Sequence, residues 1–459
     1  MPNSSIRDMV KRVQSFVEKE RKLTLLHLVP VFVLVAGAFS FWGRMSSELG
    51  VFPNAVIEFG EKGFEEVLEI TGVKKKWFIV AAPDAVPATI HDAAAMAPGL
   101  TLVSGIGPKE TPTASVVDQS GEVVHSWRLS WYDLWPNPEH VPFAERPKTW
   151  PGTHVHGILF DEETGGIVFN FERLGLIKVD ICGDPVWRAP HRTHHSLFRD
   201  DDGYFWAPGL VMQEKLKGDP EGYGPPFKDF FIWRFSPEGE LIDERRLFDV
   251  MLDHGLEGQL FMTKQANSLG VTIGDTLHFN DMEVFPQDME PGVFEPGDVM
   301  LSLRNINAVL VFNSDFSVLK HYFHGPFVRQ HDPDFIDGDT ISVFDNYSHT
   351  VSGPNPRSRI VRLNARTGDV EIEFEGSADA PFFTDVMGKH QRLPNGNILL
   401  VESANGRLLE VDADGRPVWE FRNIIREEYV ALVDNGERLD PRFDRAYFER
   451  QRSRCGGDA

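Results

Sequence analysis

Five histidines occupy the same position in a recurring sequence pattern, immediately before a short segment typical of a strand. They are His156, His195, His278, His331 and His390. If the strands that follow them line one channel, their imidazoles converge at one end of that channel. A neutral imidazole can act as a nucleophile, an acid or a base near pH 7. The pattern therefore predicts one shared reaction site, and the alternative is a common hydrogen-bonding role that fastens neighbouring units together.

Arginines and amides accompany these histidines in the same loops. A guanidinium group suits an oxyanion such as sulfate, phosphate or carboxylate, and an amide can orient an imidazole or form an Asx turn. The residues in question are Arg304, Arg357, Arg359, Arg392, Asn280 and Asn346. We expect His156, His195, Arg304, Arg392 and Asn280 to bind the substrate.

The elements that must position these residues recur six times between about residues 99 and 423. The clearest copy is GKHQRLPNGNILLVESANGRLLEVDADGRPVWEF, whose Asn395-Gly396 and Asp414-Gly415 pairs are strong turn signals. The copies average about 54 residues each, close to the length of a four-stranded blade. This pattern predicts an all-β chain folded as a six-bladed β-propeller. A β-sandwich is the alternative, but it does not account for six near-equal repeats.

The N-terminus reads as a membrane anchor. Residues 1–22 are basic and amphipathic, and residues 23–43 contain no charge, which is long enough for a transmembrane helix. The positive-inside rule then places the N-terminus in the cytoplasm and the body outside. A cleaved signal peptide, with Ala36-Gly37-Ala38 as the cleavage site, is the alternative. Residues 44–98 are expected to be a connector, and residues 424–459 a charged tail without chemistry.

Composition narrows the possible functions. The chain has 46 Lys and Arg against 69 Asp and Glu, a formal net charge of −23, which argues against nucleic acid as a partner. Its two cysteines, Cys182 and Cys455, are far apart in sequence, and nothing in the sequence suggests that they pair. Zinc-ligand spacing with cysteine is absent, so a thiolate-based metal site is not expected.

Three motifs resemble the bacterial arylsulfotransferase family over residues 99–423. They are HFND with GDVMLSLRNINAV, HDPDFIDGDTISVFDN followed by SRIVRLN, and HQRLPNGNILLVESANGRLLEVDADGRPVWEF. The resemblance implies a six-bladed propeller. It also implies transfer of a sulfuryl group from an aryl sulfate to a phenolic acceptor through a sulfated histidine, which needs no nucleotide donor, no metal and no cofactor. A bacterial inner-membrane protein with a periplasmic propeller is then expected.

The resemblance also implies roles for particular residues. His278 and His331 are similar to the family's sulfate-binding and acid–base histidines, and Arg357 or Arg359 follows the FDN motif where the family has its active-site arginine. His390 lies in the next repeat, where the resemblance implies the nucleophile.

Two other functions remain open at this point. Four imidazoles on a propeller axis can hold iron or copper in an oxygenase or lyase, and metal content would separate that case from sulfotransfer. A non-catalytic, membrane-tethered propeller that docks a protein partner is the second. In a scaffold of that kind, alanine could replace the central histidines without loss of function.

Overall fold

The computed structural model describes residues 79–147, 153–213, 221–263, 271–377 and 380–455, together with residues 11–12, 15, 35 and 37–42. The chain separates into two compact units, Met1–Lys76 and Trp77–Ala459. The predicted anchor at 23–43 lies outside the described residues, except for 35 and 37–42. Within the described part of the chain, no helix is long and apolar enough to cross a membrane.

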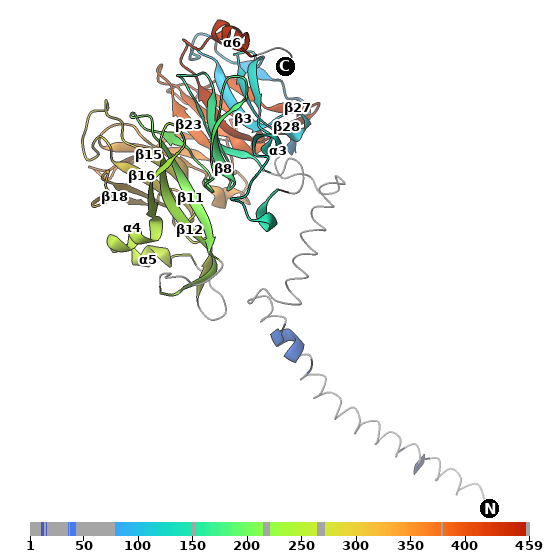
Figure 1. Cartoon of the computed structure of the whole chain (residues 1–459), viewed down its shortest axis with the longest axis vertical. Coiled ribbons are helices and arrows are strands. Elements are labelled where there is room, and N and C mark those ends of the chain that lie inside the picture. Colours follow the sequence, from blue (N-terminus) through green and yellow to red (C-terminus); the bar gives the residue numbers. More distant parts are fainter. Residues whose placement is uncertain are drawn as a thin grey trace, which may run out of the picture. The chain divides into compact units, whose positions relative to one another are not determined.

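The second unit is all-β, as the sequence predicts, and contains six sheets of four or five strands (Figure 1). The first two sheets are β29 (Val433–Arg438), β3 (Thr101–Ile106), β4 (Pro112–Val117) and β5 (Val123–Arg128), then β6 (Val155–Phe160), β7 (Ile167–Phe171), β8 (Gly175–Val179) and β9 (Pro185–Ala189). The third is β10 (Phe198–Arg199), β11 (Phe205–Gln213), β12 (Tyr223–Phe235) and β13 (Leu241–Arg246), with β14 (Thr272–Gly274) parallel to β12.

The remaining sheets repeat the antiparallel order. They are β15 (Phe279–Val284), β16 (Val299–Leu303), β17 (Ala308–Phe312) and β18 (Leu319–His324), then β19 (His331–Phe335), β20 (Thr340–Asp345), β21 (Arg359–Asn364) and β22 (Val370–Glu375). The sixth is β23 (Lys389–Arg392), β24 (Ile398–Glu402), β25 (Arg407–Val411) and β26 (Pro417–Arg422), with β2 (Ala88–Ile90) at its edge. A small sheet joins β1 (Ile79–Ala81), β28 (Tyr429–Ala431) and β27 (Ile424–Arg426).

Helices are few and short in the described part of the second unit. They are α3 (Trp131–Leu134), α4 (Leu247–Asp253), α5 (Glu257–Leu260) and α6 (Arg445–Arg452), with 3-10 turns at η1 (Pro108–Glu110), η2 (Phe143–Glu145), η3 (Arg304–Ile306), η4 (Ser348–Thr350) and η5 (Ser403–Asn405). The predicted turns at Gly396 and Gly415 are present, with φ of 89° and 76°. Glycine suits both positions because a side chain is strained at positive φ.

Each pair of neighbouring sheets buries one apolar core between them. Alternate residues of β16 divide between two cores: Leu301 packs toward the third sheet and Met300 toward the fifth. Both faces of a strand such as β16 are therefore apolar. A further core joins the sixth sheet to the first, with Trp419 and Val103 among its residues. The six large sheets thus follow one another in a closed series, which excludes the two stacked sheets of a β-sandwich.

Strands from both ends of the unit complete this series. The C-terminal strand β29 pairs with β3 and becomes the first strand of the first sheet, while β2 pairs with β26. The sheets therefore extend beyond the predicted limits of 99 and 423. The predicted charged tail 424–459 includes a structural strand and the helix α6, which packs against β5.

The two cysteines, for which the sequence suggests no pairing, form a disulfide across a sequence separation of 273 residues. Cys182 lies in the turn between β8 and β9, and Cys455 directly follows the last turns of α6. The expectation that the two cysteines do not pair is wrong, because distance along the chain does not determine distance in the fold. β29 pairs with β3 and so brings the C-terminal segment back to the first sheet. Arg452 and Arg445 of α6 bind Val124 and Asp118 of the same sheet.

Candidate active site

The five predicted histidines all lie at the beginning of the first strand of a sheet or within three residues before it. His156 and His390 are the second residues of β6 and β23, and His331 is the first residue of β19. His278 immediately precedes β15, and His195 lies three residues before β10. All five are buried, with exposed fractions of 5–7%.

Four of the five imidazoles converge. The ring centroid of His195 lies 4.1 Å from that of His156, 4.8 Å from that of His278 and 6.2 Å from that of His331. His156, His195 and His331 line a small cavity together with Ser196, Asn280, Asp281, Met387, Gly388, Lys389 and Asp434. His390 does not line this cavity, and its ring instead contacts Asp332, Asp334 and Ser342.

Irregular backbone aims these side chains inward. The pairing register shifts at the start of four first strands: between Val155 and Ile158, Phe279 and Asp281, His331 and Pro333, and Val433 and Asn435. Such bulges redirect side chains and are frequent beside active sites. His195 and His278 also have φ of 59° and 52°. Non-glycine residues rarely adopt this conformation, which is found preferentially at functional sites.

Close backbone packing holds the His195 segment in place. A Cβ atom on Gly157 would lie 2.5 Å from the carbonyl oxygen of His195 and 2.8 Å from the backbone nitrogen of Leu197. Asn170 donates a hydrogen bond from Nδ2 to the same carbonyl oxygen, at 2.9 Å. Only glycine at position 157 leaves room for this approach of β6 to the segment before β10.

His331 is a neutral imidazole whose tautomer is fixed. Its Nδ1 lies 2.6 Å from Oδ1 of Asn346, whose Nδ2 donates to the carbonyl oxygens of Thr384 and Met387. The amide orientation is thereby set, so Nδ1 of His331 carries the proton and Nε2 carries the lone pair. Burial and the charge of Arg304 hold the pKa of His331 well below its ordinary value. Its Nε2 is buried and has no hydrogen-bond partner among the described residues.

His390 has the opposite character. Its Nδ1 lies 2.9 Å from Oδ2 of Asp332, and its Nε2 lies 2.7 Å from Oγ of Ser342. Although burial lowers the pKa of His390, the carboxylates of Asp334 and Asp332 raise it above its ordinary value. These contacts favour the protonated form of His390 and engage both of its ring nitrogens.

Of the four predicted arginines, three are occupied by carboxylates. Arg359 pairs with Asp345, Arg357 with Glu375 and Arg392 with Glu373.

Arg304, in contrast, lies beside the histidines. Its backbone N–H donates to the carbonyl oxygen of His278 at 3.1 Å. Burial and the neighbouring charge of Arg329 lower the pKa of Arg304 to about 10. Two guanidinium groups that repel each other beside a neutral cluster favour an anion.

Buried carboxylates along the first strands are the main feature that the sequence did not reveal. Asp281, Asp332 and Asp434 are buried, Glu283, Asp334 and Glu437 are half-buried, and Lys389 is their cationic neighbour. Asp434 is 2% exposed and lines the histidine cavity, and burial raises its pKa well above its ordinary value. A signal was available in HFNDME and HDPDF, where acidic residues alternate directly after a histidine.

Three groups of potential ligand atoms lie close enough to share a metal ion within the described ranges. Glu172 belongs to two of them, with His154 and His156 and with His194 and His195, and the third is Asp332, Asp334 and His390. The shared carboxylate is already engaged, since Glu172 accepts hydrogen bonds from His156, from the backbone of His195 and from Arg173. The four converging imidazoles do not form such a group by themselves. The geometry therefore favours a hydrogen-bonded cluster over a metal centre.

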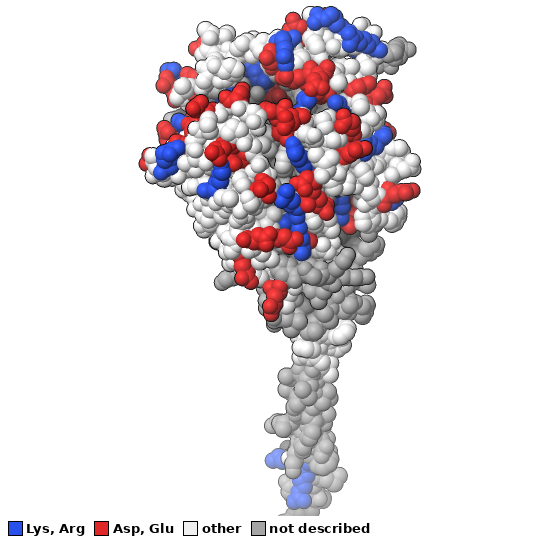
Figure 2. All heavy atoms as spheres, turned by 60° about the vertical axis from the view of Figure 1, so that its left-hand side comes forward, with Lys and Arg blue, Asp and Glu red and all other residues white. Residues whose placement is uncertain are grey.

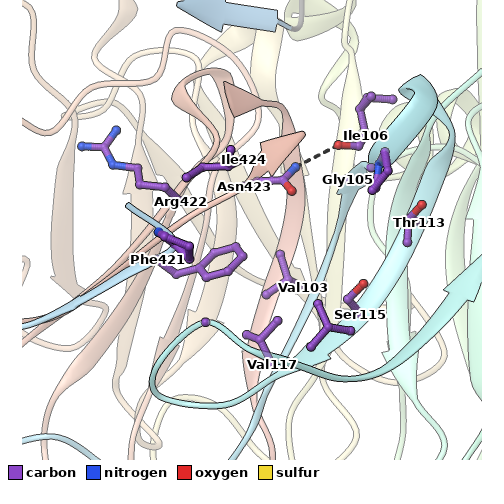
Figure 3. Close-up of a pocket in the computed structure, with 15 residues that line it drawn as sticks. Val103, Gly105, Ile106, Thr113, Ser115, Val117, Phe421, Arg422, Asn423 and Ile424 are labelled. Carbon is purple, nitrogen blue, oxygen red and sulfur yellow. Dashed lines mark hydrogen bonds between the residues drawn. The ribbon is translucent and has the colours of Figure 1, made fainter. Parts of the chain in front are cut away.

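A second cavity, of about 200 Å³ and partly open to solvent, lies between the first and sixth sheets (Figure 3). Val103, Val117 and Phe421 line it, and Asn423 crosses its edge to donate a hydrogen bond to the carbonyl oxygen of Ile106. Arg422 is its single charged lining residue. No histidine, cysteine or carboxylate lines this cavity, so the hydroxyls of Thr113 and Ser115 have no base there to activate them, and the histidine cavity is the candidate active site.

The surface of the second unit shows no broad basic face on the side seen in Figure 2. Acidic and basic side chains are interspersed there, in keeping with the formal net charge of −23.

The fold and the cavity together define an all-β protein of propeller type that carries a buried imidazole cluster at the start of its inner strands. A model of the family described as arylsulfotransferase (ASST) matches residues 160–424, more than half of the chain. The chain belongs to this family, which confirms the resemblance seen in the sequence motifs. No curated protein matches the sequence.

Several solved structures resemble the chain at low identity. A protein of unknown function from Bacteroides caccae is 12% identical, with a TM-score of 0.46 over 73% of this chain and 98% of its own. Virginiamycin B lyase from Staphylococcus aureus is 12% identical, with a TM-score of 0.31 over 58% and 69% of the two chains. The WD40 domain of Neurospora crassa Pan2 is 9% identical, with a TM-score of 0.36 over 74% and 83%.

Proposed function

We propose that this protein is an arylsulfotransferase that moves a sulfuryl group from an aryl sulfate to a phenolic acceptor through a sulfated histidine, on a six-bladed propeller. Membership of the ASST family supports the reaction class. The closed series of six sheets and six inter-sheet cores supports the blade number.

We place the nucleophile at His331 rather than at His390. The observation that carries this choice is the fixed tautomer of His331, which leaves an unpartnered Nε2 lone pair at the cavity. In the first half reaction this nitrogen attacks sulfur, an N–S bond forms, and the bond from sulfur to the aryl oxygen breaks. In the second half reaction the acceptor oxygen attacks the same sulfur and the N–S bond breaks. His390 is unsuited because a cationic imidazole has no lone pair to offer.

Charge on the transferring group would be stabilised from the arginine side of the cavity. Arg304, with its pKa lowered to about 10, remains a cation at neutral pH, and Arg329 adds to the positive field. Preorganised charges of this kind usually supply the largest single share of catalysis. His156, His195 and Asn280 line the cavity and would shape the substrate site.

The first experiment is incubation of the purified protein with 4-nitrophenyl sulfate, with and without phenol, followed by peptide mass analysis. We expect phenol to stimulate release of 4-nitrophenol and a sulfuryl adduct on the peptide that contains His331. A His331→Asn variant should lose both, whereas the matched variant His324→Asn, at the exposed end of β18, should keep both. An adduct on His390 would refute the assignment of the nucleophile. Inactivity together with stoichiometric iron or copper would favour a metal enzyme, and inactivity without metal would favour a scaffold.

We further propose that the second unit resides in an oxidising compartment and is held there by an N-terminal anchor. The disulfide between Cys182 and Cys455 supports the compartment, because such bonds persist mainly outside the cytosol. The uncharged segment 23–43 behind a basic segment supports the anchor. Thiol alkylation of intact cells before lysis tests the first point, since both cysteines should resist alkylation until reduced. Fractionation of cells expressing the chain with and without residues 1–43 tests the second.

A further inference from the structure

Asp434 stands at the start of the first strand of the first sheet, as the five histidines do in the other five sheets. It is the second residue of β29, just as His156 is the second residue of β6. In both strands the pairing register shifts directly after the first residue. The first sheet therefore contributes a carboxyl group where each of the other sheets contributes an imidazole.

The carboxyl group of Asp434 has no hydrogen-bond partner at the cavity. The residue is 2% exposed and lines the same cavity as His331. Neither of its two oxygens has a hydrogen-bond partner among the described residues. The charge that acts on it is that of Glu172, whose carboxylate binds the ring of His156 and the backbone of His195. The Asp434 carboxyl group therefore belongs to the histidine cluster but is bound by none of its members.

Asp434 carries its proton in the free protein. Burial and the negative charge of Glu172 raise the pKa of Asp434 well above its ordinary value. An ionised carboxylate at this place would be a buried charge without a counterion, which costs far more than a neutral carboxyl group. A protonated carboxyl group has one O–H donor. Asp434 therefore supplies a proton donor at the wall of the cavity.

Two other residues present acceptors to the same cavity. Nδ2 of Asn280 donates to the carbonyl oxygen of Gln330 at 2.8 Å, which fixes the amide and leaves its Oδ1 without a partner among the described residues. Nε2 of His331 is the second such acceptor. The oxygens of an aryl sulfate are themselves acceptors, so the cavity needs a donor to bind one of them.

Lys389 and Ser196 also line the cavity and carry donors, but each faces a carboxylate. Nζ of Lys389 lies 2.8 Å from Oδ1 of Asp332, and the hydroxyl of Ser196 interacts with the carboxyl group of Asp281. The O–H group of Asp434 has no such partner in the described part of the chain. It is therefore available to an oxygen of the substrate.

We propose that Asp434 is the general acid and base of the transfer reaction. This inference rests on the proposed sulfotransfer through His331. In the first half reaction the O–H bond of the Asp434 carboxyl group breaks and an O–H bond forms on the leaving aryl oxygen, while Nε2 of His331 bonds to sulfur. In the second half reaction the O–H bond of the acceptor phenol breaks, its proton returns to the Asp434 carboxylate, and the N–S bond breaks.

The charges of the sulfated intermediate suit this exchange. Nδ1 of His331 keeps its proton toward Asn346, so the sulfated ring is positively charged. The carboxylate that remains on Asp434 lines the same cavity, and the positive ring favours its ionised form until the proton returns. Asp434 lies outside residues 160–424, which the family model matches, so family membership assigns it no role.

Infrared spectra test the protonation state of Asp434 without any measurement of activity. At neutral pH, the difference between the native spectrum and that of the Asp434→Asn variant should contain the C=O stretching band of a protonated carboxylic acid. Carboxylate bands in that difference spectrum would overturn the proposal. Asparagine is also neutral and has nearly the same shape, so the urea midpoint of the variant should stay at the native value.

The dependence on the leaving group distinguishes an acid from a structural residue. Phenyl sulfate has a poor leaving group that needs a proton, whereas 4-nitrophenyl sulfate has a good one that does not. Because a positioned acid contributes about 10²–10⁴-fold, Asp434→Asn should lower kcat/KM for phenyl sulfate by about 10²-fold or more and that for 4-nitrophenyl sulfate by less than about tenfold. Asp434→Glu, which keeps the acid, should keep the ratio of the two values close to the native one.

The matched control for Asp434→Asn is Glu437→Gln. Glu437 lies on the same strand, and burial raises its pKa to about 7, but it is not one of the residues that line the cavity. We expect Glu437→Gln to leave the ratio of the two kcat/KM values unchanged. In the native protein, D₂O should lower kcat/KM for phenyl sulfate more than that for 4-nitrophenyl sulfate, a test that needs no variant.

Equal slowing of both donors by Asp434→Asn, or equal effects of D₂O on both, would refute the role of Asp434 while leaving sulfotransfer intact. A native protein that transfers from neither donor would refute the proposed function itself. The infrared spectra would then still report whether Asp434 is protonated.

Discussion

His331 and His390 occupy matching positions at the start of the first strands of two neighbouring sheets, but their surroundings favour different protonation states. The ring of His331 meets the amide of Asn346, and that of His390 meets the carboxylates of Asp332 and Asp334. Burial lowers the pKa of His331, whereas the carboxylates overcome the same effect at His390 and raise its pKa. The nearest polar partner, rather than position in the repeat, decides whether a buried imidazole favours its neutral or its protonated form.

The largest expected effect separates the two residues by function and by stability. His331→Gln should reduce sulfotransfer by at least about 10⁴-fold, because it removes the nucleophile. His390→Gln should instead lower the free energy of unfolding by about 1–3 kcal/mol, since it removes one of the two cations that bind the buried carboxylate of Asp332. Initial rates with 4-nitrophenyl sulfate and phenol, together with urea unfolding curves, measure both quantities. The assignment of a structural role to His390 would be wrong if His390→Gln abolished sulfotransfer while the variant stayed as stable as the native protein.

A smaller effect should distinguish two arginines that the sequence could not rank. Arg304→Gln should lower kcat/KM by about 10–100-fold, because it removes a cation beside the cavity. Arg392→Gln should change kcat/KM by less than about threefold, because the guanidinium of Arg392 already binds Glu373 at the edge of the sheet. Steady-state kinetics on both variants provide the measurement. Equal losses in the two would mean that the anion binds on the Arg392 side.

Local sequence signals were enough to predict the repeats and the place of each histidine in them. Turn pairs such as Asn395-Gly396 act over a few residues, and so does the alternation that marks a buried strand. The all-β class and the convergence of four imidazoles followed from those signals. The partners of the charged residues did not, because they depend on contacts between distant segments. Arg359 looked as suitable for an anion as Arg304 until the fold placed Asp345 beside it.

Long-range closure was the other feature beyond the reach of the sequence. β29 looked like part of a charged tail, yet it supplies the first strand of the first sheet and places Asp434 in the cavity. The pairing of Cys182 with Cys455 depends on the same closure. In a hydropathy pattern Asp434 is almost indistinguishable from an asparagine at an exposed position. Only the structure shows that its carboxylate is buried.

The smallest expected effect is a difference in how stability depends on pH at the two kinds of histidine. The pKa of His278 is lowered to about 4 from 6.5, so its contribution to stability is present above pH 6.5 and is lost as the pH falls toward 4. That loss should amount to about 2 kcal/mol between pH 7.5 and pH 5. The pKa of His390 is raised, so its contribution is fully present below pH 6.5 and is lost as the pH rises through its folded value.

Urea unfolding of the native protein and of the His278→Gln and His390→Gln variants from pH 5 to pH 9 tests these opposite slopes. As the pH rises from 5, the free energy of unfolding of the native protein should increase relative to that of the His278→Gln variant. The difference for His390→Gln should shrink as the pH rises above 6.5. Because each comparison subtracts every other titrating group, slopes of the same sign for the two variants would mean that one of the two charge assignments is wrong. If the stability difference for His390→Gln instead grows as the pH rises, His390 is neutral in the folded protein. It would then again be a candidate for the nucleophile.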